Sequence, residues 1–177
     1  MSRRRIVSIL LVALGLMSLV VGGLYGYVQQ RTANPQAAPL PPTVGGLPLV
    51  ASRTGPAAAA EIARMHRRPF PMSAAAVGIY QGEYEAQLWV SGPPFSWMAH
   101  RMTASMADRI ATLPDQPFRL LGQQEIGTYI IYQAEGLGQR HYFFTIGNLV
   151  VWLAVDEAIA STALHDVLQF YRNPTGP

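Results

Sequence analysis

The feature that most constrains this chain is its longest uncharged run, residues 6–28. The run holds 23 residues without Asp, Glu, Lys or Arg. As an α-helix rising about 1.5 Å per residue it would extend roughly 34 Å, enough to cross a hydrocarbon core of about 30 Å. The apolar region of a cleaved signal peptide is only about 7–15 residues long, so we expect a retained transmembrane helix.

The charges around this run predict its orientation. Three consecutive arginines precede it, whereas only Arg31 follows it closely. The positive-inside rule therefore places residues 1–5 in the cytoplasm and the rest outside the plasma (inner) membrane, in an extracytoplasmic or periplasmic position. Interfacial aromatic rings are favoured at the outer boundary. The expected membrane-interface anchors are Arg3, Arg4, Arg5, Tyr25 and Tyr27.

Small residues recur along the expected helix. Ser18, Gly22 and Gly26 are spaced by four and share one helical face. Small residues at this spacing let a second membrane helix approach closely, so we predict a helix-packing interface with a larger integral membrane protein. The alternative is that the pattern reflects only the high frequency of glycine in spanning helices.

A proline-rich segment, residues 29–46, follows the run. Four prolines fall between positions 32 and 46, and such a composition favours an extended polyproline spacer. We expect this linker either to hold a domain, residues 47–173, up to roughly 40 Å from the bilayer at about 3.1 Å per residue, or to lie along a neighbouring protein. Residues 174–177 form a short tail.

Within the domain, the hydrophobic pattern alternates between helical and strand periods. Residues 149–155 are apolar on both faces and predict a central strand. Asp156 is expected to cap the last helix. The pattern favours an α+β fold, an antiparallel sheet with helices packed mainly on one face. Helices are expected at 57–67, 96–113 and 156–173, and strands at 77–81, 84–90, 118–124, 128–134, 139–146 and 149–155.

Two of these elements have a predicted face. In the strand 84–90, Tyr84, Ala86, Leu88 and Val90 are expected to face one way. In the last helix, the buried stripe is expected to contain Ile159, Ala163, Val167 and Tyr171, with Leu164 and Leu168 alongside.

Two further patterns allow alternatives. A stripe of methionines, Met98, Met102 and Met106, predicts core packing, with a plastic binding surface as the alternative. The segments 88–90 (LWV) and 151–153 (VWL) each lead into a helix, which indicates either an internal repeat or chance.

Residue types that carry much of protein chemistry are missing or scattered. The chain contains no cysteine and no lysine, which excludes disulfides, iron–sulfur ligation, covalent haem attachment and a Walker A loop. Its four histidines show no ligand spacing. We therefore predict no catalytic residue, no cofactor and no metal site. A hydrolase assembled from distant His, Asp and Ser residues is a lesser alternative.

The charge distribution argues against nucleic acid as a partner. Residues 1–45 carry +4 and residues 46–177 carry −1, which together give the net charge of +3. The domain is therefore nearly neutral and lacks the excess of basic residues that a nucleic-acid-binding domain carries. The arginines before the run are instead suited to contact anionic membrane lipid.

Residues 77–90 and 142–155, each followed by a helix, resemble small extracytoplasmic α+β modules of the PsbP/Mog1 type. The anchor, residues 3–28, with a cofactor-free outer domain is similar to single-span accessory subunits of bacterial respiratory membrane complexes, of the alternative complex III type. This resemblance implies a structural role in an electron-transport complex, without quinone or haem chemistry of its own.

These observations predict a non-catalytic, membrane-anchored accessory or structural subunit. It would pack on a larger integral membrane complex and brace its extracytoplasmic side, with membrane lipid as a further partner. The alternative is a free-standing cell-surface module that binds a small ligand.

Overall fold

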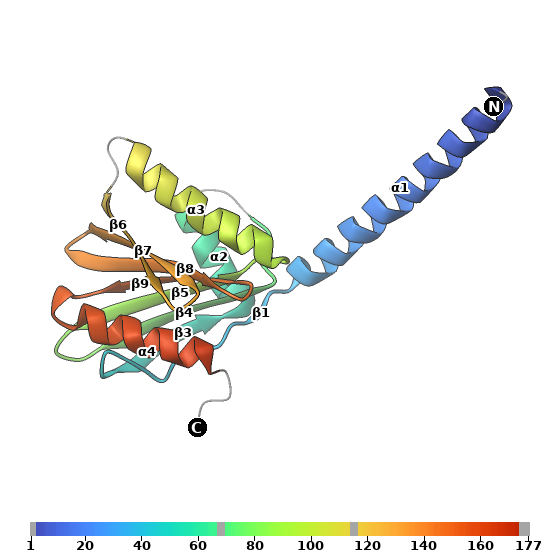
Figure 1. Cartoon of the computed structure of the whole chain (residues 1–177). Helices are drawn as coiled ribbons and strands as arrows, with labels where there is room; N and C mark the ends of the chain where they lie inside the picture. The colour runs from blue at the N-terminus through green and yellow to red at the C-terminus, as the bar shows by residue number, and fades with distance from the viewer. Residues whose placement is uncertain (1–2, 67–69, 114–116, 174–177) are drawn as a thin grey trace.

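The computed structural model describes residues 3–66, 70–113 and 117–173, with only the backbone of Arg3, Arg4 and Ile6. The expected cytoplasmic residues 1 and 2 and the tail 174–177 lie outside the described residues. The first element is a single helix, α1 (Arg3–Ala33), which projects from the rest of the molecule (Figure 1). Its segment Val7–Ala33 is long and apolar enough to span a membrane, and an 18-residue window within it has a mean hydropathy of 2.5.

The remaining chain forms an antiparallel sheet made of two meanders. The first meander ends in β5 (Glu85–Gly92) and the second in β9 (Leu149–Val155), and these two strands pair at the centre of the sheet. The pairing confirms that residues 149–155 are a central strand, because β9 has β5 on one side and β8 (Gln139–Ile146) on the other. In the order β2-β3-β4-β5-β9-β8-β7-β6, the strands are β2 (Thr43–Val44), β3 (Leu47–Thr54), β4 (Ala74–Gln81), β5 (Glu85–Gly92), β9 (Leu149–Val155), β8 (Gln139–Ile146), β7 (Tyr129–Gly136) and β6 (Phe118–Ile126).

Helices cover both faces of this sheet (Figure 1). On one face lie α2 (Gly55–Met65) and α3 (Ser96–Thr112), against the side of β5 and β9 that carries Trp89 and Trp152. On the other face lies α4 (Ala160–Arg172), which follows a 3-10 turn, η1 (Glu157–Ile159). The α+β class is therefore confirmed, with two of these helices sharing one face.

The main core lies under α4. It is formed by the apolar residues that alternate along β5, β9 and β8, and by the predicted stripe of α4. Val167 of that stripe and Phe144 of β8 are fully buried. The prediction that Ala86, Leu88 and Val90 face one way is confirmed, since all three are buried in this core.

The segment predicted to be a spacer is packed on the domain. Two residues after α1 ends, β1 (Gln36–Ala37) pairs in parallel with β4. Further along, Ala38 and Val44 are buried in the main core. The hydroxyl of Tyr80 donates to the Pro41 carbonyl at 2.9 Å, and that of Tyr171 donates to the Pro39 carbonyl at 2.7 Å. An extended chain leaves its carbonyls free for such partners, so prolines here favour docking rather than separation.

One detail of the helix start is also corrected. Asp156 makes no side-chain capping hydrogen bond to the turn that follows it. Its carboxylate instead accepts hydrogen bonds from the backbone N–H of Glu85 at 2.8 Å and from Nε2 of Gln139 at 3.2 Å. Asp156 thereby joins β5 and β8 at the end of β9.

Candidate functional site: the anchor and the methionine groove

The predicted helix-packing stripe lies on the part of α1 that the domain leaves uncovered. Ser18 Oγ donates to the Leu14 carbonyl at 2.9 Å, so its hydroxyl is satisfied within the helix. A Cβ atom built on Gly22 or Gly26 would meet nothing within 4 Å. The stripe is therefore open to a second helix, and the contact itself stays a prediction.

The predicted interface anchors divide between the two ends of α1. Arg5 is exposed, while the side chains of Arg3 and Arg4 lie outside the described residues. At the other end, the Tyr25 hydroxyl accepts a hydrogen bond from Nε2 of Gln29 at 2.9 Å. This contact holds the Tyr25 ring along the helix, where 65% of the residue is exposed.

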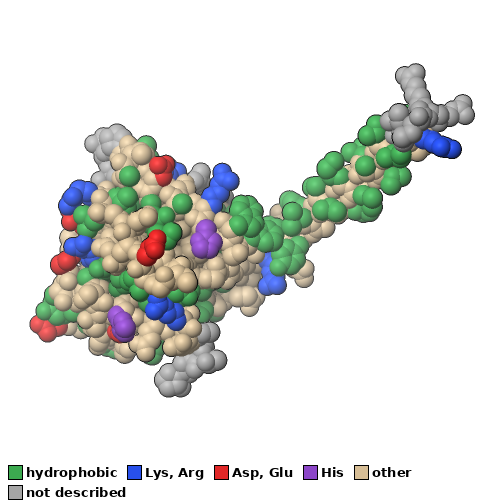
Figure 2. Space-filling model, in the orientation of Figure 1, with side chains coloured by type: hydrophobic (Ala, Val, Ile, Leu, Met, Phe, Trp, Pro, Cys, Tyr) green, Lys and Arg blue, Asp and Glu red, His purple; other side chains and the backbone are tan. Residues whose placement is uncertain are grey.

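Aromatic rings join α1 to the domain. The ring of Tyr27 stacks on Phe95 with 6.1 Å between centroids, and the Arg31 guanidinium lies 5.4 Å from the centre of the Tyr27 ring. Phe95 in turn stacks on Trp97, at 6.3 Å and an angle of 11° between planes. We call Tyr27, Phe95 and Trp97 the aromatic foot. Hydrophobic side chains gather where α1 meets the domain (Figure 2).

A groove starts beside Trp97 and runs between α3 and the end of α2. Its volume is about 740 Å³, and Met65, Met98, Met102 and Met106 line it together with Phe70 and Trp152. We call this the methionine groove. Two exposed arginines, Arg101 and Arg109, also line it, so a largely apolar channel carries positive charge along its length.

The groove exists because the face of α3 that packs on the sheet is not the predicted methionine face. Ala99, Thr103 and Ala107 are the buried residues of α3, one position beyond each predicted methionine. The sheet beneath them already presents large rings, including Phe143 and Trp152, so small residues give the closer fit. All three methionines are half-buried along the side of the helix. Met106 still packs against the buried cluster of Ala107 and Phe143, so the prediction of core packing is wrong for the stripe as a whole but holds in part for Met106.

A buried hydrogen bond holds α3 in this rotation. Thr103 Oγ1 lies 3.0 Å from Thr145 Oγ1 on β8, and both residues are buried. Thr103 also lies 3.0 Å from the His100 carbonyl, to which its hydroxyl can donate. The pair positions the methionines on the groove side of α3.

Three His and Asp residues that a hydrolase could use, His100, Asp108 and Asp166, have a structural role or lie apart. Asp166 accepts a hydrogen bond from the backbone N–H of Gly45 at 2.9 Å. His100 and Asp108 are both exposed on α3, eight residues and therefore about 12 Å apart along the axis. Among the residues that the structure describes, no group of three or more His, Cys, Asp or Glu could hold a metal ion.

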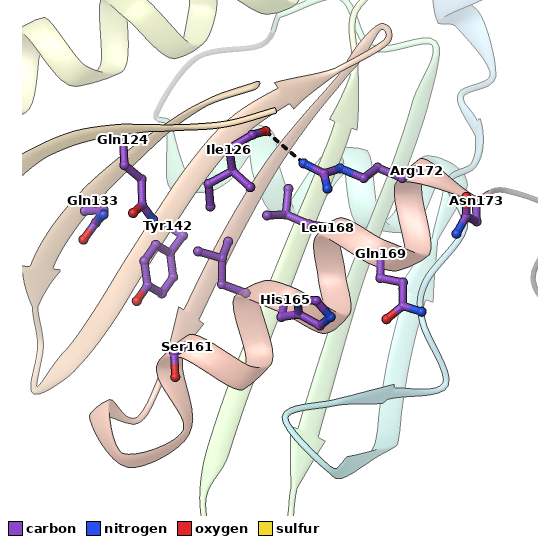
Figure 3. Close-up of a pocket in the computed structure, with 11 residues that line it drawn as sticks. Gln124, Ile126, Gln133, Tyr142, Ser161, His165, Leu168, Gln169, Arg172 and Asn173 are labelled. Carbon is purple, nitrogen blue, oxygen red and sulfur yellow. Dashed lines mark hydrogen bonds between the residues drawn. The ribbon is translucent and has the colours of Figure 1, made fainter. Parts of the chain in front are cut away.

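A second hollow lies between α4 and strands β6 to β8 (Figure 3). Its volume is about 680 Å³, and polar groups from both sides line it, among them Gln124, Gln133, Tyr142 and His165. Arg172 closes one end by donating from Nη2 to the Ile126 carbonyl at 2.8 Å. Burial raises the pKa of Tyr142, so its hydroxyl stays protonated in the neutral pH range.

Comparison of the chain with protein-family models, with curated proteins and with solved structures finds no match. The class that the structure defines is an α+β domain carried on one helix that is long and apolar enough to span a membrane. Any assignment of function therefore depends on the geometry of the anchor, the aromatic foot and the two hollows.

Proposed function

We propose that this chain is a non-catalytic accessory subunit of a larger integral membrane protein or complex. It packs on that partner through α1 and braces the partner's extracytoplasmic side with the methionine groove. The observation that carries the proposal is the position of the groove, which starts at Trp97, in the aromatic foot of α1. A partner that packs on the helix is therefore close to the groove as well.

The chemistry of both surfaces suits protein contacts. Small residues allow close helix approach in a membrane, where there is no hydrophobic driving force between helices. Methionine side chains are flexible and polarizable, so they adapt to an apolar partner surface. The orientation with the domain outside the membrane rests on the arginines before α1, and membership of a respiratory complex rests on the resemblance alone; both stay predictions.

Co-purification from native membranes in mild detergent tests the helix contact. We expect Gly22→Leu with Gly26→Leu to lose the partner that the unchanged chain recovers. Ala13→Leu is the control, because residue 13 is exposed and lies nine residues before Gly22, about 180° around the helix from it. Equal recovery with both variants would contradict a contact through this face.

The groove is tested in the same assay. We expect Met102→Arg to reduce partner recovery, since a charge in an apolar contact is left without a partner. Ala104→Arg adds the same charge at an exposed position of α3 and should leave recovery unchanged. A chain that stays monomeric through every gentle extraction would overturn the accessory role.

The hollow between α4 and β6 to β8 favours a second candidate, a cell-surface module for a small polar ligand. Its volume of about 680 Å³ falls in the range of ligand pockets, roughly 300–1,000 Å³. The amides of Gln124 and Gln133 and the Tyr142 hydroxyl lie on one side of it (Figure 3). Thermal-shift screening of the full chain with sugars and amino acids tests this candidate. A true ligand raises the unfolding midpoint, and Gln133→Ala removes that rise.

A further inference from the structure

The geometry points to a second membrane contact, made by the domain itself: Phe95 and Trp97, at the start of α3, lie in the headgroup layer beside α1. The lipid surface is the partner. The inference rests on the proposed membrane anchoring of α1, and it replaces the expectation of a domain held away from the bilayer by a domain seated on it.

The depth of Tyr27 in a spanning α1 follows from helix geometry. Met17 is the middle residue of the uncharged run, and Tyr27 lies ten residues beyond it. Ten residues correspond to about 15 Å, which is half of a hydrocarbon core about 30 Å thick. Tyr27 therefore lies at the outer boundary of the hydrocarbon, where amphipathic rings are favoured.

Because the rings of the aromatic foot stack on one another, the depth of Tyr27 in the membrane also limits the depth of Phe95 and Trp97 in the domain. Phe95 is 6.1 Å from Tyr27, so its ring lies within that distance of the hydrocarbon boundary. Trp97 is a further 6.3 Å away and is 61% exposed. The headgroup layer is roughly 5–8 Å deep on each side, so Phe95 lies within its depth, and Trp97 also lies in it when most of its 6.3 Å separation from Phe95 runs parallel to the membrane. An exposed tryptophan has little reason to face water, whereas its ring and N–H suit this layer.

The charge around the foot is compatible with an anionic surface. Residues 1–60 and residues 86–107 contain no Asp or Glu, whereas Arg31 and Arg101 belong to these segments. Thr32 and Pro35 share a hollow with Phe70 and Pro71, which places the end of α1 against the segment that follows α2. Residues 62–82 contain no acid either. The carboxylate between residues 1–60 and 62–82, Glu61, is ion-paired with Arg53 at 2.7 Å, so the arginines at the end of the domain next to α1 can face lipid phosphate.

The chain contains no cysteine, so a single introduced cysteine can be labelled specifically. Such a label tests the contact of the domain with the bilayer, which we call the seat. Ser96→Cys in the full chain, labelled with the fluorophore NBD, reports beside Trp97 without removing it, because Ser96 is exposed. The protein alone is reconstituted in vesicles of phosphatidylcholine and phosphatidylglycerol, and spin-labelled lipids carrying a shallow quencher are added. The matched control is Leu137→Cys, a 76% exposed residue in the turn between β7 and β8. This turn precedes the start of β8, whereas Phe95 follows the end of β5, which aligns with the end of β8. Positions 96 and 137 therefore lie toward opposite ends of the sheet.

We expect the label at position 96 to be quenched at least threefold more than the label at position 137. Adding Trp97→Ser should lower quenching at position 96, with an unchanged thermal unfolding midpoint because Trp97 is exposed. Equal quenching at positions 96 and 137 would overturn the seat, and it would leave a partner protein as the group that covers Trp97.

A third label separates failure of the seat from failure of the anchor. Leu19→Cys lies in α1 and is 74% exposed. Quenching at position 19 by a deep spin-labelled lipid, without quenching at position 96, means that the anchor is correct and the seat is wrong. Protection at position 19 would overturn the membrane anchoring itself, and the seat with it.

Discussion

Trp152 and His141 are joined across the central strands by a hydrogen bond of 3.1 Å, which runs from the indole Nε1–H to the imidazole Nδ1. The other ring nitrogen of His141, Nε2, lies 3.0 Å from the Gly136 carbonyl and donates to it. Only the neutral imidazole with its proton on Nε2 satisfies both contacts. Protonation would turn Nδ1 into a donor facing the Trp152 N–H.

The first prediction is a dependence of stability on pH. Burial lowers the pKa of His141 below its ordinary value of 6.5, and the hydrogen bond to Gly136 offsets only part of this. Below pH 6.5 the unfolded chain therefore binds more protons than the folded one, so the free energy of unfolding falls as the pH drops. Unfolding midpoints measured from pH 8 to pH 5 check this. His141→Gln should flatten the slope, whereas exposed His165→Gln should retain it. An unchanged slope in His141→Gln would contradict the assignment.

The second prediction compares the loss of stability on replacing either of two tryptophans that are neighbours on adjacent strands. Trp89 and Trp152 are direct cross-strand partners, yet Nε1 of Trp89 is buried and has no hydrogen-bond partner among the described residues. Trp152→Phe leaves His141 Nδ1 unsatisfied, while Trp89→Phe removes an unpaired donor. An unsatisfied buried group costs about 1–3 kcal/mol, so Trp152→Phe should be the more destabilising by about that amount. Denaturant unfolding of both variants measures the difference, and equal losses would refute it.

The third prediction concerns the threonine pair that holds α3. Thr103→Val and Thr145→Val each remove one side of the 3.0 Å contact between their hydroxyls. A double-mutant cycle should give a coupling free energy of about 0.5–1.5 kcal/mol, the usual contribution of a neutral hydrogen bond. The control cycle pairs Thr103→Val with Thr112→Val, because Thr112 bonds only within α3 in the described contacts. That control should show no coupling, and a coupling near zero for Thr103 with Thr145 would show that the contact does not hold the helix.

The fourth prediction concerns docking of the proline-rich segment. Tyr80 is fully buried, and burial raises the pKa of its hydroxyl, which stays protonated and donates to Pro41. Tyr80→Phe leaves the Pro41 carbonyl unpaired, at a cost of about 1–3 kcal/mol. Hydrogen exchange at residues 36–47 should then speed up more than at β8. Tyr84→Phe is the control, since it removes a hydroxyl from a half-buried residue outside this segment. Unchanged hydrogen exchange at residues 36–47 in Tyr80→Phe would show that this hydrogen bond does not hold the segment on the domain.

The sequence predicted the elements that have strong internal periodicity. The stripe of α4 and the alternation of β5 are each decided by one buried face, and both predictions were confirmed. β3 was missed because Leu47–Thr54 begins with a proline in its second position and exposes most of its residues. Its strand character comes from pairing with β4, a partner that local pattern does not reveal.

A methionine surface could be given only as an alternative to core packing, because periodicity alone does not fix the rotation of a helix. In α3, the set Met98, Met102 and Met106 and the set Ala99, Thr103 and Ala107 have the same spacing. The methionines, as the larger apolar residues, were expected to face the core. The aromatic rings on the sheet leave room only for small side chains, so Ala99, Thr103 and Ala107 face the sheet instead. That selection depends on β8 and β9, which come after α3 in the chain.

The similarity of 88–90 and 151–153 reflects register rather than an internal repeat. Leu88 pairs with Leu153, Trp89 with Trp152 and Val90 with Val151, so the two segments run in opposite directions on adjacent strands. A true repeat would place the following helices equivalently, but α3 and α4 lie on opposite faces of the sheet.

Between the end of α1 and the start of β1 there are only Asn34 and Pro35. A domain on a long tether sweeps a volume and captures partners that drift past at a distance. With a connection this short the swept radius is close to zero, so the chain gains no local concentration from reach. Under the proposed membrane anchoring of α1, such a chain would meet a partner only by lateral diffusion in the plane of the bilayer.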